Sequence, residues 1–196
     1  MHEVPAIATP VSEEGAASAL VAALAAQGEH PHQREAELLL AQLWLETGRG
    51  HACFNHNVGN ISASDRYEGG AFRPPWFTID ATSSPQLVNL HNEMLKGRAP
   101  RAFRAYATLE AGMGDYVGQI FHTFHTIVDA ARSGDAEAVA SAIKTSRYTP
   151  DAPLGTGRSL DSIAKEFAAR GTFAALPLAG ASATPQAAGS CPPGRS

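Results

Sequence analysis

The feature that most constrains this fold is a helical pattern that ends in a carboxylate followed by a glycine. Its apolar positions, spaced as on one helix face, are Ala36, Leu39, Leu40 and Leu43. Gly48 stands where a left-handed helix cap belongs. We therefore predict a helix from residue 32 or 33 to residue 47, with one face in the core and Glu46 in its last turn.

Caps and periodicity predict five further helices. Their ranges are 16–27, 84–96, 115–134, 135–148, and from 159 or 161 to 171. Ser84 before Pro85 is typical of a helix start. Apolar steps of three and four after Asp115 predict that the 115–134 helix is the central buried one.

Between residues 49 and 82, Gly, Asn, Pro and Ser interrupt every helical pattern. We predict a long loop with one short hairpin at Gly69-Gly70, anchored by nearby aromatic residues. The fold class is therefore mainly α, α+β at most: a helical domain with a small loop or hairpin lobe. Its organisation is a flexible arm over 1–15, one domain over 16–172 and a disordered Ala/Pro/Gly-rich tail over 173–196.

Charge and composition exclude several classes of protein. The net charge is −4, and the Lys and Arg residues are scattered, which disfavours nucleic-acid binding. Two cysteines support neither a disulfide framework nor a cysteine zinc site. The apolar run 16–26 is too short to span a bilayer and lacks the basic flank of a signal peptide, so we expect synthesis in the cytoplasm and no membrane insertion. The oligomeric state is left open.

Glu46 is the candidate for acid chemistry. A carboxyl at the C-terminal end of a helix lies at the negative end of the macrodipole, which holds its proton more tightly. Partial burial beside Trp44 would raise its pKa further, as a general acid for a glycosidic oxygen requires. The alternative is an ordinary helix-terminal glutamate in solvent.

The loop after this helix carries three asparagines, Asn55, Asn57 and Asn60, whose amides suit sugar hydroxyl and acetamido groups. The alternative is that they only form turns, because Asn tolerates left-handed backbone. His56 is a further candidate for substrate binding. His122 and His125 share a helix face, and His51 lies near His56, but neither pair has a third ligand, so we predict no metal and no cofactor.

Three motifs occur in order along the chain. They are Glu46-Thr47-Gly48-Arg49-Gly50, Asn57-Val58-Gly59-Asn60-Ile61 and Phe103-Arg104-Ala105-Tyr106. On these, with Asp115-Tyr116, the 147–151 turn and the last amphipathic helix, the chain resembles the bacterial peptidoglycan N-acetylglucosaminidases of the lysozyme superfamily, of the flagellar-rod and autolysin type. The resemblance covers about residues 30–172 and implies a lysozyme-like catalytic domain.

The resemblance also implies roles for single residues. Glu46 becomes the general acid, and Tyr106 and Tyr148 become aromatic residues of the cleft. For a second catalytic carboxylate, Glu68 is preferred over Asp65 and Asp80, because a hairpin tip could fold over the cleft. Without a second carboxylate, the N-acetyl group of the substrate could assist, or the product could close on itself as in lytic transglycosylases.

The implied function is hydrolysis of a β-1,4 glycosidic bond in the glycan strands of peptidoglycan. Phage-type or secretion-system delivery would bring such a chain to the cell wall. One alternative is a non-catalytic lysozyme-like module that binds glycan or builds a virion or cell-envelope assembly. Another is a hydrolase directed at chitin.

Overall fold

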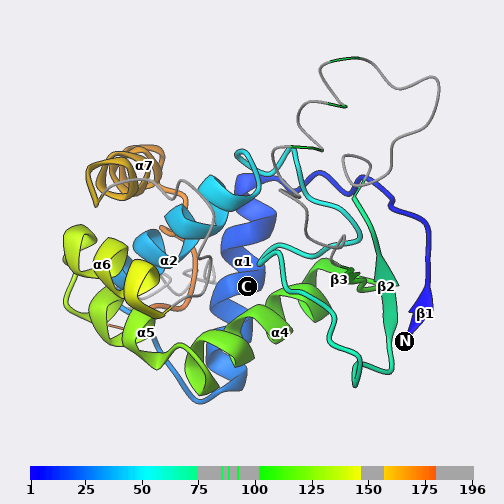
Figure 1. Ribbon diagram of the computed structural model, residues 1–196. Coiled ribbons are helices and arrows are strands. Elements are labelled where there is room, and N and C mark those ends of the chain that lie inside the picture. The colour runs from blue at the N-terminus through cyan, green and yellow to red at the C-terminus, as the bar shows by residue number, and fades with distance from the viewer. Residues whose placement is uncertain (75–84, 86–87, 89–91, 93–101, 147–156, 180–196) are drawn as a thin grey trace, which may run out of the picture.

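In the computed structural model, residues 1–74, 85, 88, 92, 102–146 and 157–179 are described. Within these ranges six helices form a body beside a small three-stranded sheet (Figure 1). This is the predicted mainly α architecture with a small second lobe. None of the described helices is long and apolar enough to cross a membrane.

Helix α2 (Gln33–Glu46) is the centre of the body. Ten consecutive residues, 35–44, are buried, because α2 packs against α1 (Glu13–Ala26), α5 (His125–Arg132) and α7 (Gly157–Arg170). The predicted ends of this helix are confirmed, but the expectation of a single core face is wrong. The central helix is α2 and not the predicted 115–134 helix.

The predicted 115–134 helix is two helices, α4 (Leu109–His122) and α5 (His125–Arg132). Thr108 begins α4, since its Oγ1 accepts from the N–H of Ala111 at 3.2 Å. The chain breaks after His122, where the N–H groups of Thr123 and Phe124 share one carbonyl. Apolar spacing continues across this break, which is why periodicity alone predicted one helix. Asp115 therefore lies inside α4 and is not its cap.

Helices α6 (Ala136–Ser146) and α7 (Gly157–Arg170) complete the body. Asp135 caps α6 as predicted, with its Oδ1 accepting from the N–H of Glu137 at 2.9 Å. Phe173 is buried after α7, and the N–H of Ala179 donates to Pro31 at 3.0 Å. Residues 173–179 thus pack on the body and are not the disordered tail predicted from 173. The rest of that tail, 180–196, lies outside the described residues.

The three-stranded sheet does not contain the predicted hairpin. Strand β2 (Gly70–Phe72) pairs antiparallel with β3 (Phe103–Arg104) and parallel with β1 (His2–Glu3). Both partners are distant in sequence, so a local turn at Gly69-Gly70 could not reveal them. Of the predicted 84–96 helix, the three described residues, Pro85, Val88 and Asn92, are helical; the rest lies outside the described residues.

The N-terminal arm is docked, whereas the sequence predicted a flexible segment over 1–15. After β1, the N–H of Thr9 donates to the Cys53 carbonyl at 2.9 Å, and the N–H of Val11 donates to Gly50 at 3.1 Å. The arm runs along the loop that follows α2, and its polar backbone groups are satisfied there. Its partners are more than 30 residues away, so composition could not show the docking.

Thr9 offers a test of this docking. Its Oγ1 accepts from the backbone N–H of His56 at 2.8 Å and donates to Cys53 Sγ. We expect Thr9→Val to lower the free energy of unfolding by about 1 to 2 kcal/mol, because the N–H loses its acceptor. Denaturant unfolding measures this, with Thr145→Val as control, since Thr145 Oγ1 bonds only carbonyls of its own helix. Equal stabilities of the two variants would contradict the docked arm.

Candidate active site

The end of α2 is shaped by the residues that follow Glu46. Thr47 Oγ1 donates to the Leu43 carbonyl at 2.7 Å and accepts from the N–H of Gly50 at 3.1 Å. Gly48 has φ 54°, the left-handed conformation that closes a helix. The segment from Glu46 to Gly50 is therefore a folded helix terminus that fixes the direction of the Glu46 side chain.

Glu46 is a shielded carboxyl. Its Oε1 accepts from Gln42 Nε2 at 3.2 Å, and its Oε2 is closed off from solvent without a hydrogen-bond partner among the described residues. Burial raises the pKa of Glu46 to about 8, and the Gln42 bond lowers it by less than burial raises it. Most Glu46 side chains are therefore protonated at neutral pH.

The Gln42 side chain is itself held from α4. It is fully buried, and its Oε1 accepts from the hydroxyl of Tyr116 at 2.8 Å. Burial and the nearby Glu46 raise the pKa of Tyr116 well above its usual value, so this hydroxyl stays protonated. Three side chains thus connect α4 to the end of α2.

Asn55 and Asn57 hold the loop together, which corrects their expected role in substrate binding. Both side chains are buried. Asn55 accepts from the N–H of Ile7 at 2.9 Å and donates to the Pro5 carbonyl at 3.1 Å. Asn57 accepts from the N–H of Ile61 at 2.8 Å and donates to two carbonyls. Both amide groups are bonded to backbone N–H and carbonyl groups, so the alternative that these asparagines shape the turns of the loop describes them.

Asn60 lies beside Glu46, and His56 belongs to the same loop. Asn60 is exposed, and its Nδ2 donates to the backbone carbonyl of Glu46 at 3.2 Å. His56 Nδ1 is shielded and has no hydrogen-bond partner among the described residues. Both residues have φ near 50°, which shows that they also shape the turns of the loop. A role in substrate binding stays a prediction for each.

A charged cluster lies at the end of β3. Arg104 Nη1 contacts the Asp115 carboxylate at 2.7 and 3.1 Å, and the guanidinium lies 4.8 Å from the centre of the Tyr67 ring. The Tyr106 hydroxyl donates to the same carboxylate. Burial, then the hydrogen bond to Asp115 and then the Asp115 charge, raise the pKa of Tyr106, so it remains a neutral phenol.

Backbone bonds place this cluster beside the asparagine loop. The N–H of Arg104 donates to the Ile61 carbonyl at 3.0 Å, and that of Tyr106 donates to the Asn55 carbonyl at 2.9 Å. Because Asn60 in the same loop bonds to Glu46, one loop joins the end of α2 to the β3 cluster. The structure thus brings the first, second and third sequence motifs together.

The described part of the chain shows no contact between Glu68 and Glu46. Glu68 is exposed in the turn before β2, and no bond between it and Glu46 exists among the described residues. The carboxylate that the fold does place beside Tyr106 is Asp115. Tyr148 lies outside the described residues.

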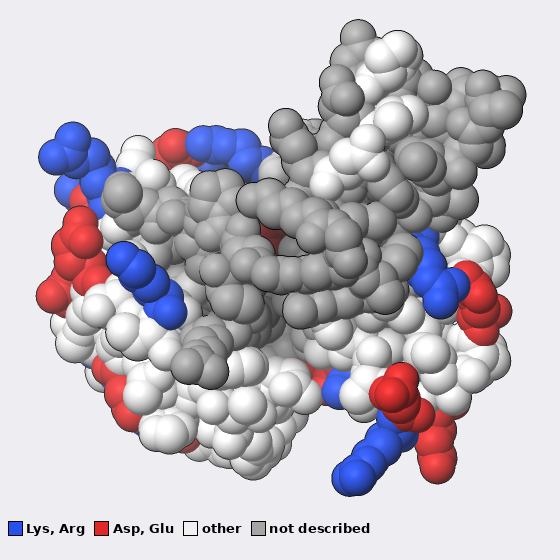
Figure 2. Space-filling model, viewed as in Figure 1, with Lys and Arg blue, Asp and Glu red and all other residues white. Residues whose placement is uncertain are grey.

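The described part of the chain holds no group of metal ligands, and the face in Figure 2 carries charges of both signs. No group of three or more His, Cys, Asp or Glu side chains in that part of the chain could hold a metal ion. On the face in Figure 2, the described Lys and Arg side chains lie next to Asp and Glu side chains. Ion pairs such as Arg49–Glu166 at 2.9 Å account for this mixture.

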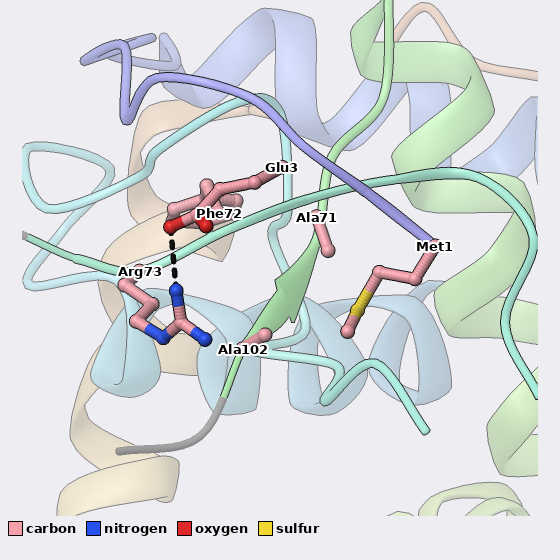
Figure 3. A pocket seen from close by; sticks show the side chains of 6 residues that line it. All are labelled: Met1, Glu3, Ala71, Phe72, Arg73 and Ala102. Carbon is pink, nitrogen blue, oxygen red and sulfur yellow. Dashed lines mark hydrogen bonds and ion pairs between the residues drawn. The ribbon is translucent and has the colours of Figure 1, made fainter. Parts of the chain in front are cut away.

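A surface hollow lies at the sheet and not at Glu46. Its lining residues are Met1, Glu3, Ala71, Phe72, Arg73 and Ala102 (Figure 3). An ion pair between Arg73 and Glu3 crosses it at 2.5 Å. None of the residues predicted to bind a sugar lies in its lining, so the candidate site rests on Glu46 and its neighbours.

Two residues of the site were missed by sequence reasoning. Gln42 is a polar residue inside an apolar helix, four positions before Glu46, and that spacing puts both side chains on one face. Asp115 was interpreted as a helix cap, although it lies in one helix turn with the motif residue Tyr116 and binds the Arg104-Tyr106 motif. Gln42 therefore carried a detectable signal, whereas the partners of Asp115 required the fold.

The fold is that of known hydrolase domains. No protein-family model matches the chain, and no curated protein matches it. The peptidoglycan hydrolase of Sphingomonas sp. A1 superposes with TM-score 0.53 at 21% identity, over 83% of this chain and 94% of that one. A Glu-to-Ala variant of that hydrolase gives TM-score 0.54 at 21% identity, over 83% and 96%.

A solved structure of another hydrolase has the same fold. The glycoside hydrolase domain of Salmonella typhimurium FlgJ superposes with TM-score 0.50 at 19% identity, over 84% of this chain and 93% of that domain. The chain therefore has the lysozyme-like fold of these hydrolase domains and spans nearly their whole length.

Proposed function

We propose that this chain cleaves a β-1,4 glycosidic bond in the glycan strands of peptidoglycan, with Glu46 as the general acid. The observation that carries the proposal is a shielded carboxyl with a pKa of about 8 at the end of the central helix. The fold supports it, because domains named as peptidoglycan and glycoside hydrolases share that fold.

In the proposed reaction, Glu46 gives its proton from Oε2 to the glycosidic oxygen as the carbon–oxygen bond breaks. A positioned acid accelerates such a step by roughly 10² to 10⁴. Water then adds to the sugar and returns a proton to the Glu46 carboxylate, which restores the acid. Asn60 and His56 would bind hydroxyl or acetamido groups beside this carboxyl.

Tyr106 belongs to the same proposal as an aromatic residue that faces the sugar. Its hydroxyl proton is directed to Asp115, so its oxygen lone pairs are available to positive charge at the anomeric carbon. Asp115 already accepts from Arg104 and Tyr106 and is therefore assigned to hold the tyrosine rather than to act as a nucleophile.

The energetics of Glu46 favour an enzyme over a non-catalytic module. A carboxyl whose folded-state pKa exceeds its unfolded-state value destabilises the fold at neutral pH. A glycan-binding or scaffolding module would gain stability from glutamine at this position. A catalytic acid, in contrast, requires the carboxyl group of glutamate.

The experiment that tests the proposal is digestion of purified peptidoglycan followed by mass spectrometry of the fragments. We expect fragments with N-acetylglucosamine at the new reducing end, as the N-acetylglucosaminidase resemblance implies. Muramic acid at that end would show that the other β-1,4 bond of the strand is the one cleaved. Ends with a 1,6-anhydro ring would indicate a lytic transglycosylase. Intact glycan strands would overturn the proposal.

The pKa of Glu46 predicts a pH dependence. The protonated acid is the active form, so kcat/KM should fall as the pH rises through about 8, with the loss complete within roughly two units above that value. A pH series of kcat/KM on soluble glycan fragments measures this fall, the alkaline limb of the pH profile. A limb centred near 4.5, the ordinary glutamate value, would contradict a shielded acid.

A further inference from the structure

Tyr116, Gln42 and Glu46 form a buried series of hydrogen bonds across two helices. The Tyr116 hydroxyl donates to Gln42 Oε1 at 2.8 Å, and Gln42 Nε2 donates to Glu46 Oε1 at 3.2 Å. Tyr116 and Gln42 have no exposed surface. The series ends at Glu46 Oε2, which is shielded and has no partner among the described residues.

The order of donors in this series fixes which oxygen of Glu46 carries the proton. Because Tyr116 occupies Gln42 Oε1, the amide can present only its nitrogen to Glu46. A neutral carboxyl that accepts at Oε1 carries its hydrogen on Oε2. The proton is therefore on the oxygen that has no hydrogen-bond partner among the described residues, and Gln42 does not bind it.

We propose that Gln42 and Tyr116 are positioning residues for the reaction, which hold Glu46 with its proton on Oε2. The inference rests on the proposed function of Glu46 and extends it. Neither residue touches the reacting atoms. Their effect is exerted through the orientation of one amide group.

The variant Tyr116→Phe removes the donor and keeps the ring. The amide of Gln42 can then turn and present its oxygen to Glu46, so that the acid proton is bound inside the protein. Loss of a donor destabilises the carboxylate, and gain of an acceptor stabilises the neutral acid, so both raise the pKa of Glu46. We expect an upward shift of about 0.5 to 1 unit, the size of one hydrogen bond.

Among the described residues, burial and the Gln42 hydrogen bond set the pKa of Glu46, and no charged side chain is a cause of its shift. On its own helix the contact is Gln42, which is uncharged. From α4 the ionisable side chain that senses the Glu46 charge is Tyr116, which stays protonated. From α7, which packs on α2, the described carboxylates are paired elsewhere: Glu166 with Arg49 and Asp161 with Arg34.

The expected kinetic result separates positioning from binding. In Tyr116→Phe, kcat should fall about tenfold while KM stays within about twofold, because substrate contacts are unchanged and the proton is misdirected. The alkaline limb of kcat should move upward with the pKa of Glu46. If the role of Tyr116 were purely structural, Tyr116→Phe would lower stability and leave the alkaline limb at the same pH.

The control is Ile143→Val, a buried change on α6 that costs a comparable roughly 1 kcal/mol of stability. Its alkaline limb and kcat should match those of the wild-type chain. Gln42→Met is the second variant and should shift the limb in the same direction, because it too removes the donor to Glu46. An unchanged limb in both Tyr116→Phe and Gln42→Met, or an equal shift in Ile143→Val, would overturn the proposal.

A readout without substrate separates this proposal from the proposed function. The full chain labelled with carbon-13 at the glutamate carboxyls shows the titration of Glu46, assigned by the signal missing in Glu46→Gln. An upward shift in Tyr116→Phe supports the positioning series even if the wild-type chain leaves peptidoglycan intact, a result that would overturn only the function. A titration that does not move would overturn the series even in an active hydrolase.

Discussion

Glu46→Gln is expected to abolish peptidoglycan cleavage, with a loss of roughly 10² to 10⁴ in kcat, because the amide keeps the volume of the acid and has no acidic proton to give. The release of soluble fragments from peptidoglycan measures this loss. The matched control is Glu35→Gln, a buried glutamate in the first turn of the same helix whose pKa is also raised by burial. The control should keep activity within a few-fold of the wild-type chain.

The same substitution should increase stability at neutral and alkaline pH. The folded-state pKa of about 8 lies above the ordinary value of 4.5, so the wild-type fold has no penalty below pH 4.5 and loses stability as the pH rises through 8. Between these limits the loss reaches roughly 3 to 5 kcal/mol. Unfolding of Glu46→Gln should lack this part of the pH dependence. A variant that is inactive and also less stable at pH 8 would indicate damage to the fold instead.

Gly112→Ala should be the most disruptive single-methyl change near the site. A Cβ at Gly112 would lie 1.9 Å from the carbonyl oxygen of His56 and 3.2 Å from the Tyr106 ring, so α4 could no longer touch the asparagine loop. We expect a loss of about 2 to 4 kcal/mol in the free energy of unfolding, together with loss of activity, because the backbone must move. Denaturant unfolding of the purified variant gives the measurement.

Gly114→Ala provides the control for that variant. This position lies in the same helix, and a Cβ there meets no atom of the described residues within 4 Å. Alanine in place of glycine should therefore stabilise α4 by about 0.5 to 1 kcal/mol. If both alanine variants behaved alike, the close approach of α4 to the loop would be contradicted.

Local signals in the sequence predicted the parts of the fold that are local. The end of α2 followed from Thr47 and Gly48, whose own backbone geometry closes the helix. The cap at Asp135 followed from a side chain that bonds two residues ahead. In both cases the partners lie within four residues, and this is the range over which composition and spacing carry information.

The errors concern contacts over long sequence distances. Asn55 was assigned to sugar binding because its partners, Pro5 and Ile7, belong to an arm whose docking the composition could not show. The supposed hairpin failed because β2 pairs with strands from both sides of it in the chain.

Within the candidate site, Glu46 could be proposed as the acid from the sequence, but its surroundings could not be predicted. Glu46 stood out because a carboxyl ends an apolar helix before a glycine. The bond from Tyr116 to Gln42 joins residues 74 positions apart, so the orientation of the acid proton required the packing of α4 on the end of α2.

The most direct test is to follow the Glu46 carboxyl carbon and kcat/KM over the same pH series in the full chain. The account predicts that the carboxyl titrates near 8 and that activity falls with the same midpoint. Cleavage of peptidoglycan by a chain whose Glu46 titrates near 4.5, or whose activity persists after that carboxyl is deprotonated, would contradict it.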